Sequence, residues 1–132
     1  NKMSKSYDNT IDIFLSDKKL KKTIMQIKTD SIPAEAVKNH ETCNVFNLYR
    51  LIASDNQVLE MQKKYQAGNF GYGQAKEDLY KLILDKFQNE RDKFQFFMNN
   101  TELIEKELIM GAEKVRVIAD EVLNRVRSKI GY

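Results

Sequence analysis

The strongest chemical signal in this sequence lies near its start, where two lysines are interleaved with serines. Lys2 and Lys5 stand three residues apart in a polar stretch that also holds Ser4 and Ser6. Such a segment can wrap a triphosphate, because ammonium groups supply movable charges and hydroxyl and backbone N–H groups supply donors. Its chemical use would be to neutralise the charge that develops on a leaving pyrophosphate. The alternative is a disordered tail rich in lysine and serine.

Three arginines near the end of the chain fit a polyanionic partner. Arg116 and Arg127 fall about 20° apart on a helix with 100° per residue, and Arg125 lies between them in sequence. They can contact nucleic-acid phosphates, or they can form ion pairs along their own helix. The acidic residues available for such pairs are Glu113, Asp120 and Glu121. The lysine cluster at 18–22 leaves the same choice between a polyanion and a solvated helix face.

Apolar residues with helical spacing dominate the chain, and only residues 11–14 offer a weak strand candidate. The sequence therefore predicts an all-α fold, a helical bundle of about five helices preceded by a flexible signature loop. Residues 1–15 are expected to form the loop and its connection, and 16–132 the helical domain. The predicted helices cover residues 17–28, 45–53, 54–67 and 74–98, with a last helix from residue 100.

Capping residues mark several of these helix ends. Asn44 is the expected N-cap of the second helix, and Ser54 with Gln57 resembles a capping box for the third. Gly68 fits the position just after that helix. Asn99 is the expected N-cap of the last helix.

Composition narrows the class of protein. The chain has 132 residues, 31% of them charged, which suits one globular domain. One cysteine, Cys43, and one histidine, His40, exclude a disulfide framework and a His-rich or multi-cysteine metal site, so no metal site is predicted. We find no transmembrane segment and expect a cytoplasmic protein. Both ends are basic, which permits a polyanionic partner without requiring one.

Two glycine-flanked aromatic residues and the lone cysteine can each have a functional role or a purely structural one. Phe70 and Tyr72 can stack on an unpaired base, but packing in the core or at a hinge is the favoured interpretation, because aromatic residues beside glycines often pack at a turn. Cys43 stands just before a helix, where a thiolate would be favoured, yet a buried small apolar side chain is the expected role.

The segment Lys2–Ser6, KMSKS, is the second signature of class I aminoacyl-tRNA synthetases, and its continuation resembles the bacterial and organellar tryptophanyl-tRNA synthetases. The segments CNVFNLY and GYGQAK distinguish this family from the tyrosyl-tRNA synthetases, which share KMSKS. The matching segments run in the family's order: KMSKSYDNTI (2–11), KTDS (28–31), TCNVFNLYRL (42–51), YQAGNFGYGQAK (65–76) and GAEKVRVIADEVLNRVRSKIG (111–131).

The resemblance implies roles for the signature residues. Lys2 to Ser6 would contact ATP, and Lys5 would stabilise the leaving pyrophosphate with Lys2 second to it. Ser4 and Ser6 would supply hydroxyl or backbone donors, and Met3 would anchor the segment by packing. The family uses ATP with Mg²⁺ to join tryptophan to its tRNA, so ATP, tryptophan and this tRNA are the expected partners. Arg116, Arg125 and Arg127 would then meet the tRNA.

The resemblance also implies that part of the enzyme is missing. In the family, KMSKS closes a Rossmann catalytic domain that carries a HIGH signature and the tryptophan pocket. Here the motif starts at residue 2, and the lone histidine lies in Lys38-Asn39-His40-Glu41. We therefore expect a C-terminal fragment, inactive alone, of a parent enzyme that dimerises through the missing part. The alternative is a stand-alone helical module that binds tRNA or serves as a structural partner, without catalysis.

Overall fold

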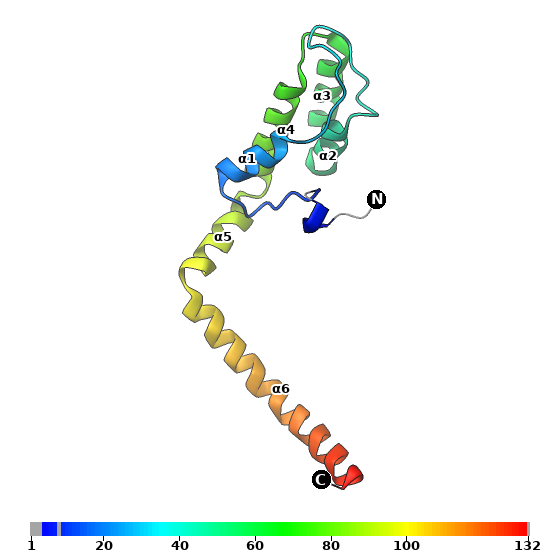
Figure 1. The fold of residues 1–132 in the computed structure, drawn as a ribbon. Coiled ribbons are helices and arrows are strands. Elements are labelled where there is room, and N and C mark those ends of the chain that lie inside the picture. Colours follow the sequence, from blue (N-terminus) through cyan, green and yellow to red (C-terminus); the bar gives the residue numbers. More distant parts are fainter. Residues whose placement is uncertain (1–3, 8, 132) are drawn as a thin grey trace. The chain divides into compact units, whose positions relative to one another are not determined.

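Helices account for all the regular structure in the described part of the chain, residues 4–7 and 9–131 of the computed structural model (Figure 1). The all-α prediction is therefore confirmed, and residues 11–14 form no strand. A 3₁₀ turn covers Lys5–Tyr7. The α-helices are α1 (Asp17–Met25), α2 (Asn44–Ile52), α3 (Asp55–Ala67), α4 (Tyr72–Lys86), α5 (Gln88–Asn99) and α6 (Thr101–Ile130).

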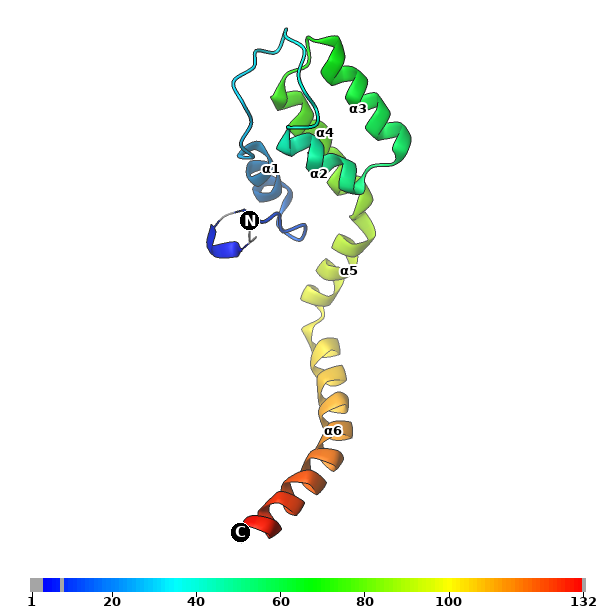
Figure 2. The same cartoon turned by 90° about the vertical axis from the view of Figure 1, so that its right-hand side faces the viewer.

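The chain divides into two compact units, Asn1–Arg91 and Asp92–Tyr132, and the boundary falls inside α5. In the first unit α4 is central, because it contacts both α1 and α2, while α2 also packs on α3 (Figure 2). The predicted boundary between residues 15 and 16 stays a prediction.

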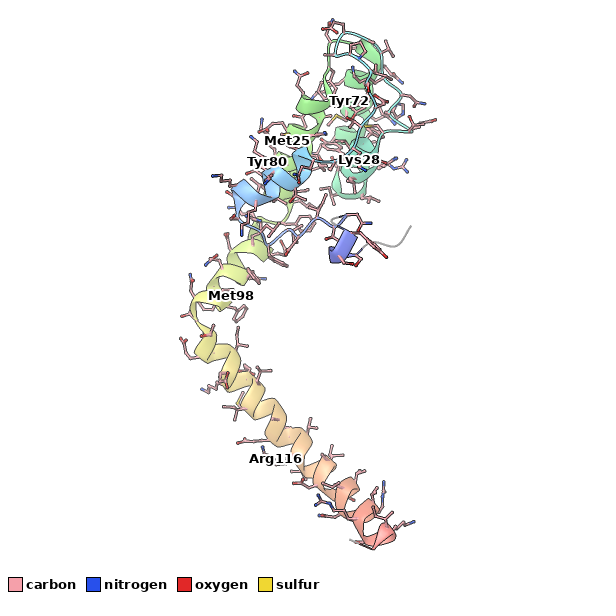
Figure 3. All side chains as sticks on the ribbon, viewed as in Figure 1. Met25, Lys28, Tyr72, Tyr80, Met98 and Arg116 are labelled. Atoms are coloured by element: carbon pink, nitrogen blue, oxygen red, sulfur yellow. The ribbon has the colours of Figure 1, made fainter. Side chains whose placement is uncertain are left out.

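The second unit presents its side chains to solvent. Neither α5 nor α6 contains a buried residue. The side chains of α6 project from all sides of the helix in Figure 3, where Arg116 is labelled. Its predicted apolar stripe exists as a pattern, but Leu108 and Val115 are each more than 60% exposed. The stripe is therefore an uncovered face in the described residues.

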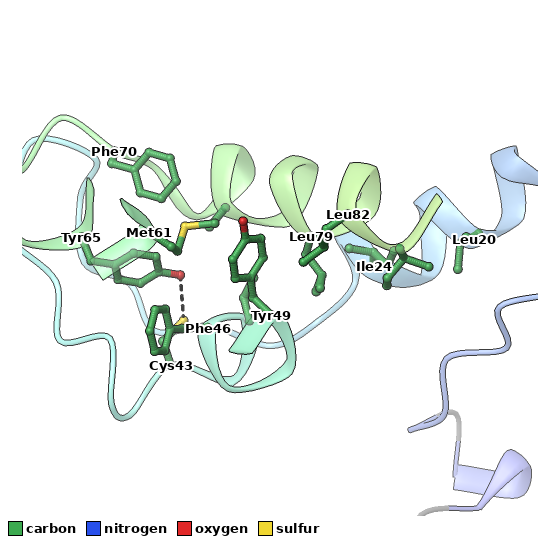
Figure 4. Close-up of a cluster of buried hydrophobic side chains, with 13 residues drawn as sticks. Leu20, Ile24, Cys43, Phe46, Tyr49, Met61, Tyr65, Phe70, Leu79 and Leu82 are labelled. Carbon is green, nitrogen blue, oxygen red and sulfur yellow. Dashed lines mark hydrogen bonds between the residues drawn. The ribbon is translucent and has the colours of Figure 1, made fainter. Parts of the chain in front are cut away.

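The core of the first unit follows the predicted spacing. The predicted stripe of α4 is buried, and Leu20 and Ile24 of α1 have no exposed surface. Figure 4 shows Leu79 and Leu82 near Ile24 at one end of this cluster, with Tyr49 beside them. At the other end the rings of Phe46 and Tyr65 meet edge to face, with 5.7 Å between centroids. Helical spacing in the sequence thus identifies the residues that α1 and α4 contribute to this core.

The end of α3 depends on a residue without a side chain. Gly68 has φ +74° and ψ 179°, a conformation that only glycine adopts readily. A Cβ at Gly68 would lie 2.7 Å from the carbonyl oxygen of Glu35, in the long connection between α1 and α2. The same carbonyl accepts a hydrogen bond from the N–H of Asn69 over 3.4 Å. Gly68 thus ends the helix as predicted and lets the connection lie against it.

Several predicted boundaries are wrong, among them the end of α1, which comes at Met25 rather than at residue 28. The single helix expected over 74–98 is two helices, because Phe87 leaves the helical region (φ −109°, ψ 18°) while its side chain packs against the core. The N-cap of α2 is Cys43, and the Asn44 side chain instead donates to the carbonyl oxygen of Lys28 over 3.2 Å. The last helix is capped by Asn100, one residue later than predicted, since Asn99 still belongs to α5. The box of Ser54 with Gln57 is confirmed, with Ser54 N 2.9 Å from Gln57 Oε1.

Candidate functional site

The signature segment makes a tight turn in its described part. The N–H of Tyr7 donates to the carbonyl oxygen of Ser4 over 3.0 Å. The hydroxyl groups of Ser4 and Ser6 are hydrogen-bonded at 2.8 Å, and the N–H of Ser4 donates to Oδ1 of Asn9 over 2.8 Å. The turn therefore gathers two hydroxyl groups at one exposed place, as a phosphate-binding segment needs.

Two of the predicted ATP contacts, Lys2 and Met3, lie outside the described residues, and so does the side chain of Lys5. Their roles stay predictions. The described backbone of Lys5 lies within the turn, between the two serines.

A connecting segment, residues 11–15, joins this turn to α1. Its apolar side chains, Ile11, Ile13 and Leu15, pack against the core of the first unit. Asp12 shapes it internally, because its carboxylate accepts from Phe14 N over 2.9 Å and its carbonyl oxygen from Leu15 N over 3.3 Å. The signature turn is thus attached to the helical core by packing as well as by chain connectivity.

Arg91, the last residue of the first unit in sequence, binds the connecting segment. Nη1 of Arg91 donates to the carbonyl oxygens of Ile13 and, over 3.0 Å, of Leu15. Nη2 lies 2.5 Å from Oδ1 of Asp17, the first residue of α1. Arg91 falls within the single helix expected over 74–98, and this contact was not predicted from the sequence. The one local signal is the run of charged and polar residues at 88–93, which interrupts the apolar spacing.

The three arginines of α6 are exposed and available. Arg116, Arg125 and Arg127 all lie on one continuous helix, so the shared face predicted for Arg116 and Arg127 exists. Within the described part of the chain none of the three forms a salt bridge, and the ion pairs considered for them are not formed.

The lysine cluster of α1 is partly engaged within the fold. Lys21 Nζ lies 2.8 Å from the Glu77 carboxylate and 5.5 Å from the centroid of the Tyr80 ring. The hydrogen bond to Glu77 is the main cause that raises the pKa of the Lys21 ammonium. Lys21 thus ties α1 to α4, while Lys18, Lys19 and Lys22 are exposed.

The glycine-flanked aromatic residues serve the fold. The Phe70 ring is buried 5.6 Å from that of Tyr65, with Lys64 Nζ 5.5 Å from its centroid. The Tyr72 hydroxyl is buried and makes no hydrogen bond of normal geometry, and burial, then the Asp30 carboxylate, raise its pKa. Both rings therefore pack within the first unit, and the Tyr72 ring lies 6.4 Å from that of Tyr65.

The cysteine prediction is confirmed. Cys43 is 6% exposed, and its Sγ is hydrogen-bonded to the Tyr65 hydroxyl at 3.3 Å, the dashed contact in Figure 4. Burial, and next the bond to Cys43, raise the pKa of Tyr65. The phenol therefore resists ionisation more than an exposed tyrosine does, and the thiol has a structural partner.

A buried lysine organises the long connection between α1 and α2, and sequence reasoning assigned it no role. Lys38 is 2% exposed. Its Nζ donates to the carbonyl oxygens of Pro33, Ala34 and Ala36 over 2.7, 3.0 and 3.0 Å. Its backbone N–H donates to the carbonyl oxygen of Tyr65 over 2.9 Å, which fastens the connection to α3.

Two further kinds of site are absent from the described residues. No group of three or more His, Cys, Asp or Glu side chains is arranged to hold a metal ion there. None of the helices described is long and apolar enough to cross a membrane.

Both a family model and individual known proteins match the sequence of this chain. Residues 1–88 match the family of tRNA synthetases class I (W and Y). A tryptophan–tRNA ligase of Campylobacter jejuni strain RM1221 is 42% identical over 98% of this chain, which spans 41% of that relative. A tryptophan–tRNA ligase of Fusobacterium nucleatum is 40% identical over 98% of this chain and 40% of its own length.

Solved structures agree with the sequence comparison. The tryptophanyl-tRNA synthetase of Campylobacter jejuni, crystallised with ADP and tryptophan, superposes with a TM-score of 0.91 at 41% identity over 99% of this chain and 41% of its own. A second crystal structure from the same organism gives a TM-score of 0.92, over 42% of that chain.

Proposed function

Because this chain belongs to the class I tRNA synthetases of the tryptophan and tyrosine family, we propose that it is the C-terminal part of a tryptophan–tRNA ligase. The observation that carries the proposal is continuous similarity to such ligases over 98% of the chain, from the KMSKS signature through the last helix. The chain spans 41% of those relatives, so the tryptophan pocket is assigned to the remainder. We place the reaction in the cytoplasm, and we expect the chain alone to be inactive.

The reaction runs in two steps. A carboxylate oxygen of tryptophan attacks the α-phosphorus of ATP, and the bond to the bridging oxygen breaks to release pyrophosphate. A hydroxyl group of the terminal tRNA ribose then attacks the carbonyl carbon of the adenylate, and AMP leaves. The signature acts in the first step, because negative charge grows on the pyrophosphate as the phosphorus–oxygen bond breaks.

The residues of the signature turn fit the triphosphate. Ser4 and Ser6 supply hydroxyl groups from one turn, with Lys5 between them. The ammonium groups of Lys5 and Lys2 would balance the developing charge. Because Mg²⁺ in such sites is held largely by substrate phosphates, it would arrive with ATP as part of the substrate.

A joined enzyme tests the proposal. This chain replaces the matching 41% of the Campylobacter jejuni ligase, so that it follows that enzyme's own N-terminal part. We expect tryptophan-dependent exchange of pyrophosphate into ATP, and charging of tryptophan-accepting tRNA. The control is the truncated ligase without the replaced part. A folded joined enzyme with no more exchange than this control would contradict the proposal.

The arginines of α6 should bind the tRNA backbone. In the joined enzyme, Arg116→Gln, Arg125→Gln and Arg127→Gln together should weaken tRNA binding at least about tenfold and flatten its dependence on salt, because three phosphate contacts are lost. Adenylate formation should not change. The measurement is tRNA affinity at two salt concentrations.

A matched control removes the same number of charges from the same helix with Lys106→Gln, Lys114→Gln and Lys129→Gln. Equal losses in the control and in the arginine variant would show that only the net charge of α6 matters. An unchanged affinity in the arginine variant would remove these residues from the tRNA interface.

A further inference from the structure

We propose that Arg91 positions the signature turn for catalysis, because it holds the connecting segment between that turn and α1 at two carbonyl groups and also binds the first residue of α1. The inference rests on the proposed function and deepens it. Arg91 touches no substrate in this account, and it acts through Lys5. The carbonyl oxygens of Ile13 and Leu15 and the carboxylate of Asp17 are its three acceptors.

The connecting segment has little regular structure of its own. Residues 9–12 are irregular and 13–15 form a turn. A segment of this kind has many accessible conformations unless groups elsewhere hold its backbone. Arg91 supplies such a hold, because its two carbonyl acceptors belong to alternate residues and its third acceptor begins a helix.

The chemistry of the guanidinium group suits this task. Its planar fork of N–H donors fixes direction as well as distance, which a lysine ammonium cannot do. The Arg91 side chain is 18% exposed, so water competes only weakly for these donors. The Asp17 side chain is 67% exposed, so we assign the positioning mainly to the two carbonyl contacts.

The backbone of Arg91 is itself held by a hydrogen bond. Its N–H donates over 3.0 Å to the carbonyl oxygen of Phe87, the residue at which α4 ends. The Phe87 side chain packs against the same core as Ile13 and Leu15. The residue that interrupts the two helices thus holds the backbone of Arg91 and packs on the core that also receives the connecting segment.

The contacts of Arg91 lie only a few residues from the signature turn along the chain. Seven positions separate Ser6 from Ile13, and that length of chain spans at most about 24 Å when fully extended. Releasing Ile13 and Leu15 enlarges the volume that the turn samples. Since a misplacement of about 1 Å can cost a hundredfold in rate, the loss should appear in the chemical step.

The first test needs only this chain. Arg91→Gln should speed hydrogen exchange at the Leu15 amide about tenfold or more, while amides of α4 keep their protection. Arg50→Gln, which changes an exposed arginine of α2, is the matched control and should alter neither. Unchanged exchange at Leu15 overturns the proposal whatever the enzyme does.

The second test uses the joined enzyme. Arg91→Gln should lower the kcat of tryptophan-dependent exchange about tenfold or more, with the KM for tryptophan within about twofold. Arg91→Lys should restore little, because it lacks the fork, whereas Asp17→Asn should cost less than about threefold because it keeps both carbonyl contacts.

A double substitution separates positioning from general stability. In the Lys5→Ala enzyme, adding Arg91→Gln should change exchange by less than about threefold, because the group that Arg91 positions is gone. Losses that multiply in full, or a KM for tryptophan that rises as much as kcat falls, overturn the proposal. A joined enzyme without any exchange activity contradicts the proposed function instead, and the hydrogen-exchange test then decides the role of Arg91.

Discussion

Lys5→Ala in the joined enzyme is expected to slow adenylate formation about a hundredfold or more while tryptophan binding stays nearly unchanged. A donor that stabilises charge present only in the transition state contributes to kcat, and removing one such donor typically costs a factor of about 10² to 10³. The tryptophan pocket is assigned to the part of the ligase outside this chain. The measurement is pyrophosphate exchange at varied tryptophan and ATP concentrations.

The control for Lys5 is Lys18→Ala, which removes an exposed lysine of α1. It should leave exchange unchanged. If Lys5→Ala weakens tryptophan binding by the same factor as it slows the reaction, Lys5 contributes uniform binding rather than transition-state stabilisation. A full rate in Lys5→Ala would remove the signature from the mechanism.

Lys38→Met is expected to lower the free energy of unfolding of the first unit by about 2 kcal/mol. The variant keeps an apolar side chain of similar length but removes the ammonium donor from three carbonyl oxygens. Those of Ala34 and Ala36 lose it at about 1 kcal/mol each, while that of Pro33 still accepts from the N–H of Ala36 over 3.3 Å. Relief from burying a charge offsets only part of this loss, because the ammonium is already solvated by these carbonyls. Urea unfolding followed by tyrosine fluorescence measures this change in the free energy of unfolding.

Tyrosine fluorescence suits this test because Tyr7, Tyr49, Tyr65, Tyr72 and Tyr80 all lie in the first unit. Lys63→Met, at an exposed position of α3, is the matched control and should change stability by less than about 0.5 kcal/mol. An unchanged midpoint in Lys38→Met would show that the connection does not need its buried ammonium.

The periodic part of the fold was predictable from the sequence because its signals are local. The stripe of α4 and the cap at Ser54 are patterns within a few residues, and both are confirmed. Membership of the synthetase family was also predictable, since the signature and its sequel are specific, and it is confirmed.

The contacts that organise the site were not predictable because their partners are distant or carry no side-chain signal. Arg91 binds carbonyl groups 76 and 78 residues away, and no pattern of residue types marks a carbonyl as an acceptor. Lys38 looked like one more charged residue of a loop, since its burial arises only when the connection folds back on α3. The break at Phe87 follows from packing against the core rather than from a helix-breaking residue.

The close approach at Gly68 determines where this part of the molecule can vary during evolution. Glu35 takes part through its backbone carbonyl oxygen, and its exposed side chain is free to change. Any side chain at position 68 would instead meet that carbonyl oxygen within 2.7 Å. Substitutions should therefore accumulate in the connection between α1 and α2 while position 68 stays glycine, because only position 68 has no room for a side chain.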